Sequence, residues 1–103
     1  WEKAKAFDSS AVISKKFIPK SELGDLDNLT FRLEKNGQKV QEGSTNQMIF
    51  NIEEIICYVS KFFTLKIGDL IYTGTPSGVG KVNINDELTG YLKDKKLFEF
   101  KVK

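Results

Sequence analysis

The sequence predicts a mainly β domain that carries one amphipathic helix. Apolar and polar residues alternate from residue 29 to 34, and Asn36-Gly37, the strongest short signal for a β-hairpin, follows. Farther along, apolar residues recur every three or four positions from residue 52 to 63, which is the period of a helix face. A chain of 103 residues makes one domain, which can bury about two thirds of the unfolded chain's surface. We therefore expect one unit with an ordinary apolar core.

The strands are expected in two groups. The alternating residues 29–34 predict a half-buried strand, and residues 38–42 return as its hairpin partner. Near the other end, Leu70-Ile71-Tyr72 predicts a buried strand, and the alternation over residues 98–102 predicts a closing one. Residues 1–25 lack strong periodicity, so we expect loops and edge strands there.

A helix is expected to begin at Asn51. Asn51 and Glu54 have the spacing of a capping box, in which each side chain bonds the backbone N–H of the other residue. The apolar stripe that follows consists of Ile52, Ile55, Ile56, Val59, Phe62 and Phe63. This stripe predicts core packing rather than a groove for a partner, and Cys57, close to it, is expected to be a small buried hydrophobic residue.

Two short segments, residues 66–70 and 83–88, echo each other as turns that lead into strands. Asn85 stands in the second where Gly68 stands in the first, and Asn is the best non-glycine occupant of a left-handed backbone position. We therefore expect one turn geometry in both, with the aspartate of each turn bonded to its own backbone.

Composition excludes several functions. The chain has no histidine and one cysteine, so it cannot build a Ser-His-Asp triad, a Cys-His pair or a zinc site of His or Cys ligands. The lone Cys57 allows no internal disulfide, which favours a reducing, cytosolic compartment. No apolar run reaches the length of a bilayer span, so no membrane segment is expected. With a net charge of +2 and a single arginine, Arg32, nucleic-acid binding is not expected either.

The segment Tyr72-Thr73-Gly74-Thr75-Pro76-Ser77-Gly78-Val79-Gly80-Lys81 is the richest in glycine. Its glycine spacing and the valine after Lys81 do not fit a Walker phosphate loop, and no third glycine or helix pattern completes a dinucleotide fingerprint. From composition alone, a tight structural loop between two strands is the favoured interpretation.

Three blocks of this chain resemble the fumarylacetoacetate hydrolase family. The first block runs from Ile67 to Gly80 and includes Thr73-Gly74-Thr75-Pro76-Ser77-Gly78. The second block is Gln41-Glu42-Gly43-Ser44-Thr45-Asn46-Gln47-Met48-Ile49-Phe50 with the later Tyr58-Val59-Ser60-Lys61. The third block is Ala4-Lys5-Ala6-Phe7-Asp8. They occur in the family's order across nearly the whole chain and are most similar to its acylpyruvate hydrolase and oxaloacetate decarboxylase branch.

This resemblance implies a mixed β-sandwich roll, a homodimer, and a Mg²⁺ or Mn²⁺ ion chelated by a small 2-oxo acid or diketo acid substrate. It implies carbon–carbon bond cleavage through an enolate that the ion stabilises. By position, Lys5 is the catalytic ammonium beside metal and substrate, and Ser9 lies near the water shell of the metal. The resemblance likewise implies that Thr75 binds the substrate carboxylate and that Gly74 lets the backbone approach it.

The chain departs from the family in one important respect. The metal-binding carboxylates of the family lie upstream of the segment that begins here with Trp1, as does a lid with a His-Glu pair. Asp69 and Asp86 are expected to serve their turns, and Asp8 alone does not make a site for a hard cation. A smaller departure is Ser10-Ala11-Val12-Ile13, where many members carry a Cys-Pro motif.

We therefore interpret residues 1–103 as the C-terminal portion of a catalytic domain that holds no direct metal ligand. The chain alone is expected to be inactive, and hydrolase, decarboxylase and isomerase activities stay open. The alternative is a non-catalytic β-domain that serves dimerisation or binding, and a basic barrel that binds nucleic acid ranks last. A cytoplasmic location is expected, or a mitochondrial one if the source is eukaryotic.

Overall fold

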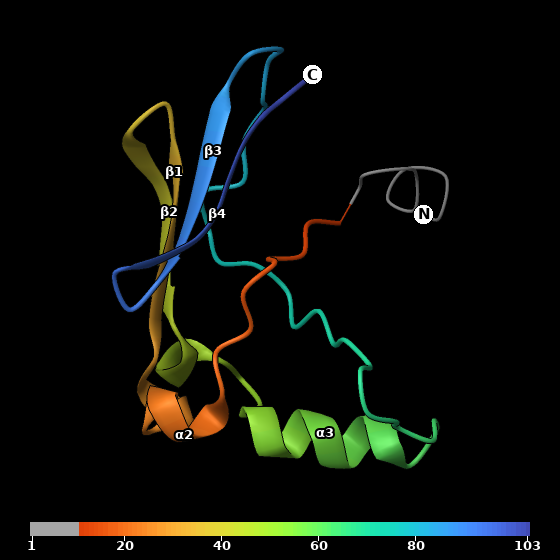
Figure 1. Cartoon of the computed structure of the whole chain (residues 1–103). Helices are drawn as coiled ribbons and strands as arrows, with labels where there is room; N and C mark the ends of the chain where they lie inside the picture. The colour runs from red at the N-terminus through yellow and green to blue at the C-terminus, as the bar shows by residue number, and fades with distance from the viewer. Residues whose placement is uncertain (1–10) are drawn as a thin grey trace.

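A computed structural model describes residues 11–103 of the chain. Within these residues, four strands form one antiparallel sheet in the order β2-β1-β3-β4, and one longer helix, α3, lies beside the end of the sheet (Figure 1). In chain order the elements are α2 (Lys20–Leu23), the 3₁₀ turn η1 (Leu26–Asn28), β1 (Thr30–Lys35), β2 (Gln38–Ser44), the 3₁₀ turn η2 (Thr45–Gln47), α3 (Ile52–Ser60), β3 (Glu87–Leu92) and β4 (Lys95–Lys101). The predicted fold class, mainly β with one amphipathic helix, is confirmed, and that helix is α3.

The predicted hairpin is β1 and β2, joined at Asn36-Gly37. Both turn residues have positive φ, 54° and 82°, as such a two-residue turn requires. The Asn36 side chain also accepts a bond from the backbone N–H of Glu87 at 2.9 Å and donates to Asp86 at 3.0 Å. These bonds hold the hairpin turn against the start of β3, so the turn helps to place the third strand.

The sheet has one apolar and one polar face. Cross-strand neighbours share a face, and the register therefore gathers Phe31, Leu33, Leu88, Leu92, Phe98 and Phe100 on one side. On the other side, the Arg32 guanidinium stacks on the Tyr91 ring with 3.8 Å to its centroid. The alternation in β1 and the closing strand, β4, are confirmed by this arrangement.

Two glycines give aromatic rings room on the apolar face. A Cβ placed on Gly90 would overlap the ring of Phe98 on the next strand. A Cβ on Gly43 would stand 2.9 Å from the ring of Phe31. Each ring therefore lies across the backbone of its neighbouring strand.

Gly90→Ala is expected to destabilise the sheet by about 1–3 kcal/mol, because the Phe98 ring must leave its position or strain the strand. The measurement is the urea concentration at the unfolding midpoint. It uses the complete product of the gene that encodes these residues, called the complete gene product below. Adding Phe98→Leu to Gly90→Ala should recover part of the loss, since the smaller side chain vacates the overlap. An unchanged midpoint in Gly90→Ala would contradict the proposed crowding.

The helix begins as predicted. The Glu54 N–H donates to the Asn51 side chain at 2.8 Å, and the Asn51 N–H donates to the Glu54 carboxylate at 3.1 Å, which completes the capping box. The predicted burial of its stripe is wrong within the described residues. Phe62 and Phe63 lie beyond the last helical residue and are 67% and 69% exposed, and Cys57 is exposed as well.

The apolar stripe is exposed because of the position of α3. The chain leaves the sheet through η2, so the helix lies past the end of β2 and covers neither face of the sheet (Figure 1). Without a helix packed over it, the apolar face of the sheet stays half-buried rather than buried. Leu29 is the only large hydrophobic residue that is buried in residues 11–103. The expected ordinary core is therefore wrong for this part of the chain.

The long connection from α3 to β3 also differs from expectation. The predicted strand Leu70-Ile71-Tyr72 pairs with no strand in the described range, and it is exposed rather than buried. Predicting a strand from an apolar run fails here because no neighbouring strand stands beside it. Residues 11–25 likewise contain no edge strand, and the short helix α2 lies there instead.

The two echoing turns have the expected common geometry. Gly68 and Asn85 have φ of 93° and 76°. The Asp69 carboxylate accepts from the backbone N–H of Lys66, and the Asp86 carboxylate from that of Asn83, both at 2.8 Å. The hydrogen bond from Asn36, with that from Asn83, lowers the pKa of Asp86 below its ordinary value.

No helix in the described part has the length and apolar character that a bilayer span needs.

Candidate active site

The glycine-rich loop is docked along strand β2. Pro76 lies against Gly43, with its Cβ 3.4 Å from where a glycine Cβ would stand. Farther along the strand, a Cβ on Gly78 would overlap the backbone oxygen of Val40. Two blocks that are far apart in the sequence, around residues 41–50 and 67–80, therefore meet in space.

A side chain ties the loop to the strand between these two contacts. Gln41 lies opposite Leu33 on the apolar face of the hairpin. Its amide nitrogen Nε2 is 2.8 Å from the Thr75 hydroxyl oxygen and 3.0 Å from the backbone oxygen of Pro76. The hydroxyl predicted to bind substrate is therefore held by a residue of β2.

Thr75 and Gly74 line a hollow of about 910 Å³. Its walls are mostly apolar and come from β1, the segment after β2, the first turns of α3 and the glycine-rich loop. The lining residues are Phe31, Ser44, Thr45, Gln47, Met48, Ile49, Phe50, Ile52, Ile55, Ile56, Asp69, Ile71, Thr73, Gly74, Thr75 and Pro76. Concave apolar walls with a few polar groups are typical of small-molecule sites.

Gly74 contributes space to this hollow. Its φ is 102°, a conformation that side-chain-bearing residues rarely adopt, and nothing lies within 4 Å of where a Cβ would be. A ligand atom can therefore approach the loop backbone next to the Thr75 hydroxyl. Lys5 and Ser9 lie outside the described residues, and so does Asp8, so whether the Lys5 ammonium faces the same hollow stays a prediction.

The described residues do not fit a metal ion. Within residues 11–103, no three His, Cys, Asp or Glu side chains gather into a possible ligand set. Asp69, the single carboxylate in the lining, already accepts the N–H of Lys66. Any divalent ion bound near the hollow would need donors from elsewhere.

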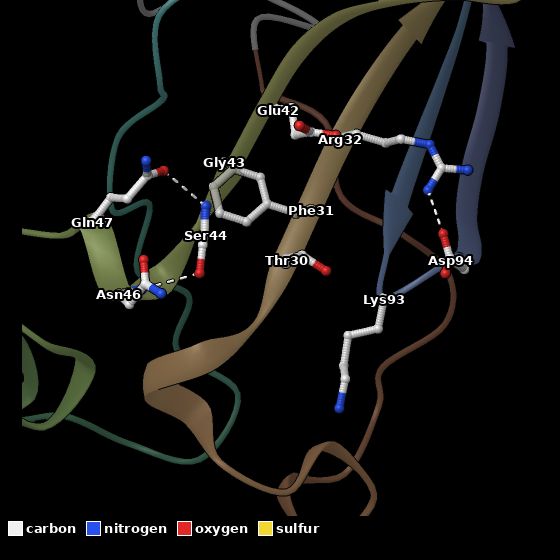
Figure 2. A pocket seen from close by; sticks show the side chains of 10 residues that line it. All are labelled: Thr30, Phe31, Arg32, Glu42, Gly43, Ser44, Asn46, Gln47, Lys93 and Asp94. Carbon is white, nitrogen blue, oxygen red and sulfur yellow. Dashed lines mark hydrogen bonds and ion pairs between the residues drawn. The ribbon is translucent and has the colours of Figure 1, made fainter.

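A second hollow of about 390 Å³ lies near the turn between β3 and β4, and Figure 2 shows its lining. Arg32, one of two cations in its lining, is 2.9 Å from the Glu34 carboxylate and 2.8 Å from that of Asp94. The hydrogen bond to Glu34 is the main cause that raises the pKa of Arg32. Because two carboxylates already surround the guanidinium, this hollow does not favour an anionic ligand.

Sequence reasoning named Thr75 and Gly74, which the structure places at the hollow, but it did not name Gln41 or the apolar wall as parts of the site. Gln41 belongs to the second block of the resemblance, and the hairpin register places it on the apolar face. Those two signals together could have identified it. The wall from Met48 to Ile52 could not be assigned to the hollow, because only the fold brings it opposite Thr75.

Comparison with known proteins finds relatives that are named as enzymes, with more than one activity. The chain is 54% identical over 90 residues to the oxaloacetate tautomerase YcgM of Escherichia coli strain K12, covering 86% of this chain and 41% of the relative. It is 47% identical over 102 residues to the mitochondrial oxaloacetate tautomerase FAHD1 of Bos taurus, covering 99% and 46%. It is also 49% identical over 82 residues to a mitochondrial oxaloacetate decarboxylase of Dictyostelium discoideum, covering 80% of this chain and 37% of that relative.

Solved structures agree on the fold. A fumarylacetoacetate hydrolase family protein from Yersinia pestis CO92 matches with a TM-score of 0.92 and 45% identity, covering all of this chain and 46% of that one. A maleylpyruvate hydrolase from Sphingobium sp. SYK-6, in complex with manganese(II) and pyruvate, matches with a TM-score of 0.73 and 29% identity, covering 82% and 31%.

The chain spans less than half the length of these relatives. Over that span, the family model for the C-terminal part of fumarylacetoacetate (FAA) hydrolase matches residues 1–103. The match includes both blocks that meet at the hollow and agrees with the resemblance to the acylpyruvate and oxaloacetate branch. This chain therefore belongs to the fumarylacetoacetate hydrolase family.

Proposed function

We propose that the complete gene product acts on a small 2-oxo acid and that oxaloacetate is its first candidate substrate. The observation that carries this proposal is the Thr75 hydroxyl, tied to Gln41 at the edge of an apolar hollow in a loop whose glycine leaves room for a ligand. The relatives named oxaloacetate tautomerase and oxaloacetate decarboxylase support the choice of substrate.

The candidate reactions share one intermediate. Tautomerisation moves a proton between C3 and the oxygen on C2 of oxaloacetate, decarboxylation breaks the bond to the carboxylate on C3, and acylpyruvate hydrolysis breaks a carbon–carbon bond next to a ketone. Each passes through an enolate, whose negative charge must be stabilised. In this proposal, Thr75 donates to the substrate carboxylate, Gly74 admits it, and the apolar wall excludes water.

Two further roles extend this proposal beyond the described residues. Lys5 is the proposed catalytic group, whose ammonium would offset the enolate charge or deliver its proton, and Ser9 would lie near the water shell of a bound metal. A Mg²⁺ or Mn²⁺ ion would supply Lewis-acid stabilisation at the keto oxygen, with ligands outside residues 11–103.

We also propose that the complete gene product is a homodimer. Its proposed location is the cytoplasm or the mitochondrion, the second because several relatives are named as mitochondrial.

Thr75→Val is expected to lower kcat/KM for oxaloacetate by about 10- to 100-fold, the worth of a hydrogen bond to a charged group. The assay uses the complete gene product and follows both loss of the enol and release of pyruvate, with an acylpyruvate as a parallel substrate. Thr64→Val is the matched control, because Thr64 is exposed and does not line the hollow.

Two outcomes would contradict the proposal. Full activity in Thr75→Val would show that its hydroxyl does not meet the substrate. An inactive wild type, tested with and without added Mg²⁺ or Mn²⁺ on all three reactions, would instead favour the non-catalytic binding module.

A further inference from the structure

Gln41 meets Thr75 in an arrangement that defines where the protons lie. The backbone oxygen of Pro76 can only accept a hydrogen bond. The part of the Gln41 amide that faces it at 3.0 Å must therefore be the NH₂ group. The same nitrogen lies 2.8 Å from the Thr75 hydroxyl oxygen, so Gln41 donates to that oxygen as well.

This donation leaves the Thr75 hydroxyl proton for another acceptor. A hydroxyl can accept at its oxygen while donating its single proton. Gln41 occupies the oxygen, and within residues 11–103 no group accepts the Thr75 proton. Accepting a hydrogen bond also polarises a hydroxyl and strengthens it as a donor. The proton is therefore available to a ligand with an oxygen acceptor in the hollow.

We infer that Gln41 is a positioning residue, which holds Thr75 as a hydrogen-bond donor toward the carboxylate of the bound 2-oxo acid. This inference rests on the proposed function. Gln41 acts through Thr75 and does not itself line the hollow. Its role requires an amide, because a carboxylate at the same place would accept the Thr75 proton and remove it from the ligand.

A role limited to tying down the loop predicts something different. The loop is also docked through Pro76 against Gly43 and through Gly78 against Val40. These contacts remain when the Gln41 side chain changes, so the loop has support without the amide. Methionine fits the apolar face and has a similar length, and Gln41→Met therefore removes the hydrogen bonds with little change in packing.

The experiment compares Gln41→Met and Gln41→Glu in the complete gene product, alone and combined with Thr75→Val. Gln38→Glu is the matched control, since Gln38 lies on the same strand but is exposed and outside the hollow. The readouts are KM and kcat for oxaloacetate, the dissociation constant of pyruvate from titration calorimetry, and the melting temperature.

Gln41→Met is expected to raise KM and the pyruvate dissociation constant by about fivefold to tenfold, the worth of one neutral hydrogen bond. Gln41→Glu should raise both by about 100-fold, because it captures the Thr75 proton and repels the substrate carboxylate. In the Thr75→Val background, Gln41→Met should cause no further loss, so the effects of the two positions are non-additive. Gln38→Glu should match the wild type.

The outcomes separate the two claims. An active wild type whose Gln41 variants lose melting temperature but keep KM and pyruvate affinity would overturn the positioning role and leave the proposed function standing. Additive losses in the Thr75→Val background would overturn it as well. A wild type that turns over neither oxaloacetate nor the acylpyruvate and does not bind pyruvate would refute the proposed function, and the role of Gln41 with it.

Discussion

Replacing Gly78 by alanine is expected to lower kcat/KM for oxaloacetate by about 100-fold or more in the complete gene product. Gly78 has a φ of 104°, and an added Cβ would overlap the backbone oxygen of Val40. A backbone oxygen in a strand cannot move aside as a flexible side chain can. The loop must therefore leave β2 and carry Thr75 away from Gln41.

Gly80→Ala is the matched control for this substitution. Gly80 lies two residues farther along the same loop, does not have a positive φ, and has nothing within 4 Å of where a Cβ would stand. It should retain activity and melting temperature. Circular dichroism of Gly78→Ala should show an intact sheet, since the strands pair without the loop. Full activity in Gly78→Ala would show that the docked loop is not needed for turnover.

Several features that the sequence predicts correctly are local. The Asn36-Gly37 turn, the Asn51 and Glu54 capping box, and the two turns at Gly68 and Asn85 each depend on a few neighbouring residues. Their backbone conformation and hydrogen bonds are therefore set by the residues themselves, whatever packs around them.

The features that fail depend on distant backbone. The stripe of α3 and the run Leu70-Ile71-Tyr72 both have the apolar character of buried elements, yet both are largely exposed in the described structure. Periodicity indicates which face seeks a partner but does not say whether a partner is present. Without a layer over α3 or a strand beside residues 70–72, the same patterns lead to exposed surface.

The candidate site likewise has one part that the sequence predicts and one part that only the fold reveals. Thr75 and Gly74 are identified through the resemblance of their loop, and the structure places both at one hollow. The tie from Gln41 needs the sheet register and the loop path together, which no spacing along the chain gives. Lys5 and Ser9, outside the described residues, stay predictions from the resemblance alone.

The 103-residue chain on its own is expected to bind a dye for apolar surfaces strongly and to unfold in urea without a sharp transition. Sixteen large hydrophobic residues in the described part are exposed, among them Ile49 at 92% and Ile67 at 107%. Apolar burial supplies about 25 cal/mol per Å², and it must exceed the conformational entropy of every ordered residue. With these side chains exposed and Leu29 the only large hydrophobic residue buried in residues 11–103, the described part has little of that burial.

Substitutions at exposed and buried positions test whether the exposed apolar side chains cause the dye binding. Ile49→Thr and Ile67→Thr should each reduce dye binding with little effect on the circular dichroism of the sheet, whereas Leu29→Thr, at a position 4% exposed, should weaken that signal. Light scattering at two protein concentrations tells a monomer from an assembly. A monomer that unfolds cooperatively and binds no dye would show that the exposed apolar side chains cover one another. A dimer that unfolds cooperatively would show that a second copy covers them. If the chain alone folds in one of these ways and shows no turnover, the missing activity reflects missing chemical groups. If the chain is poorly folded, the missing activity reflects only the loss of the hollow.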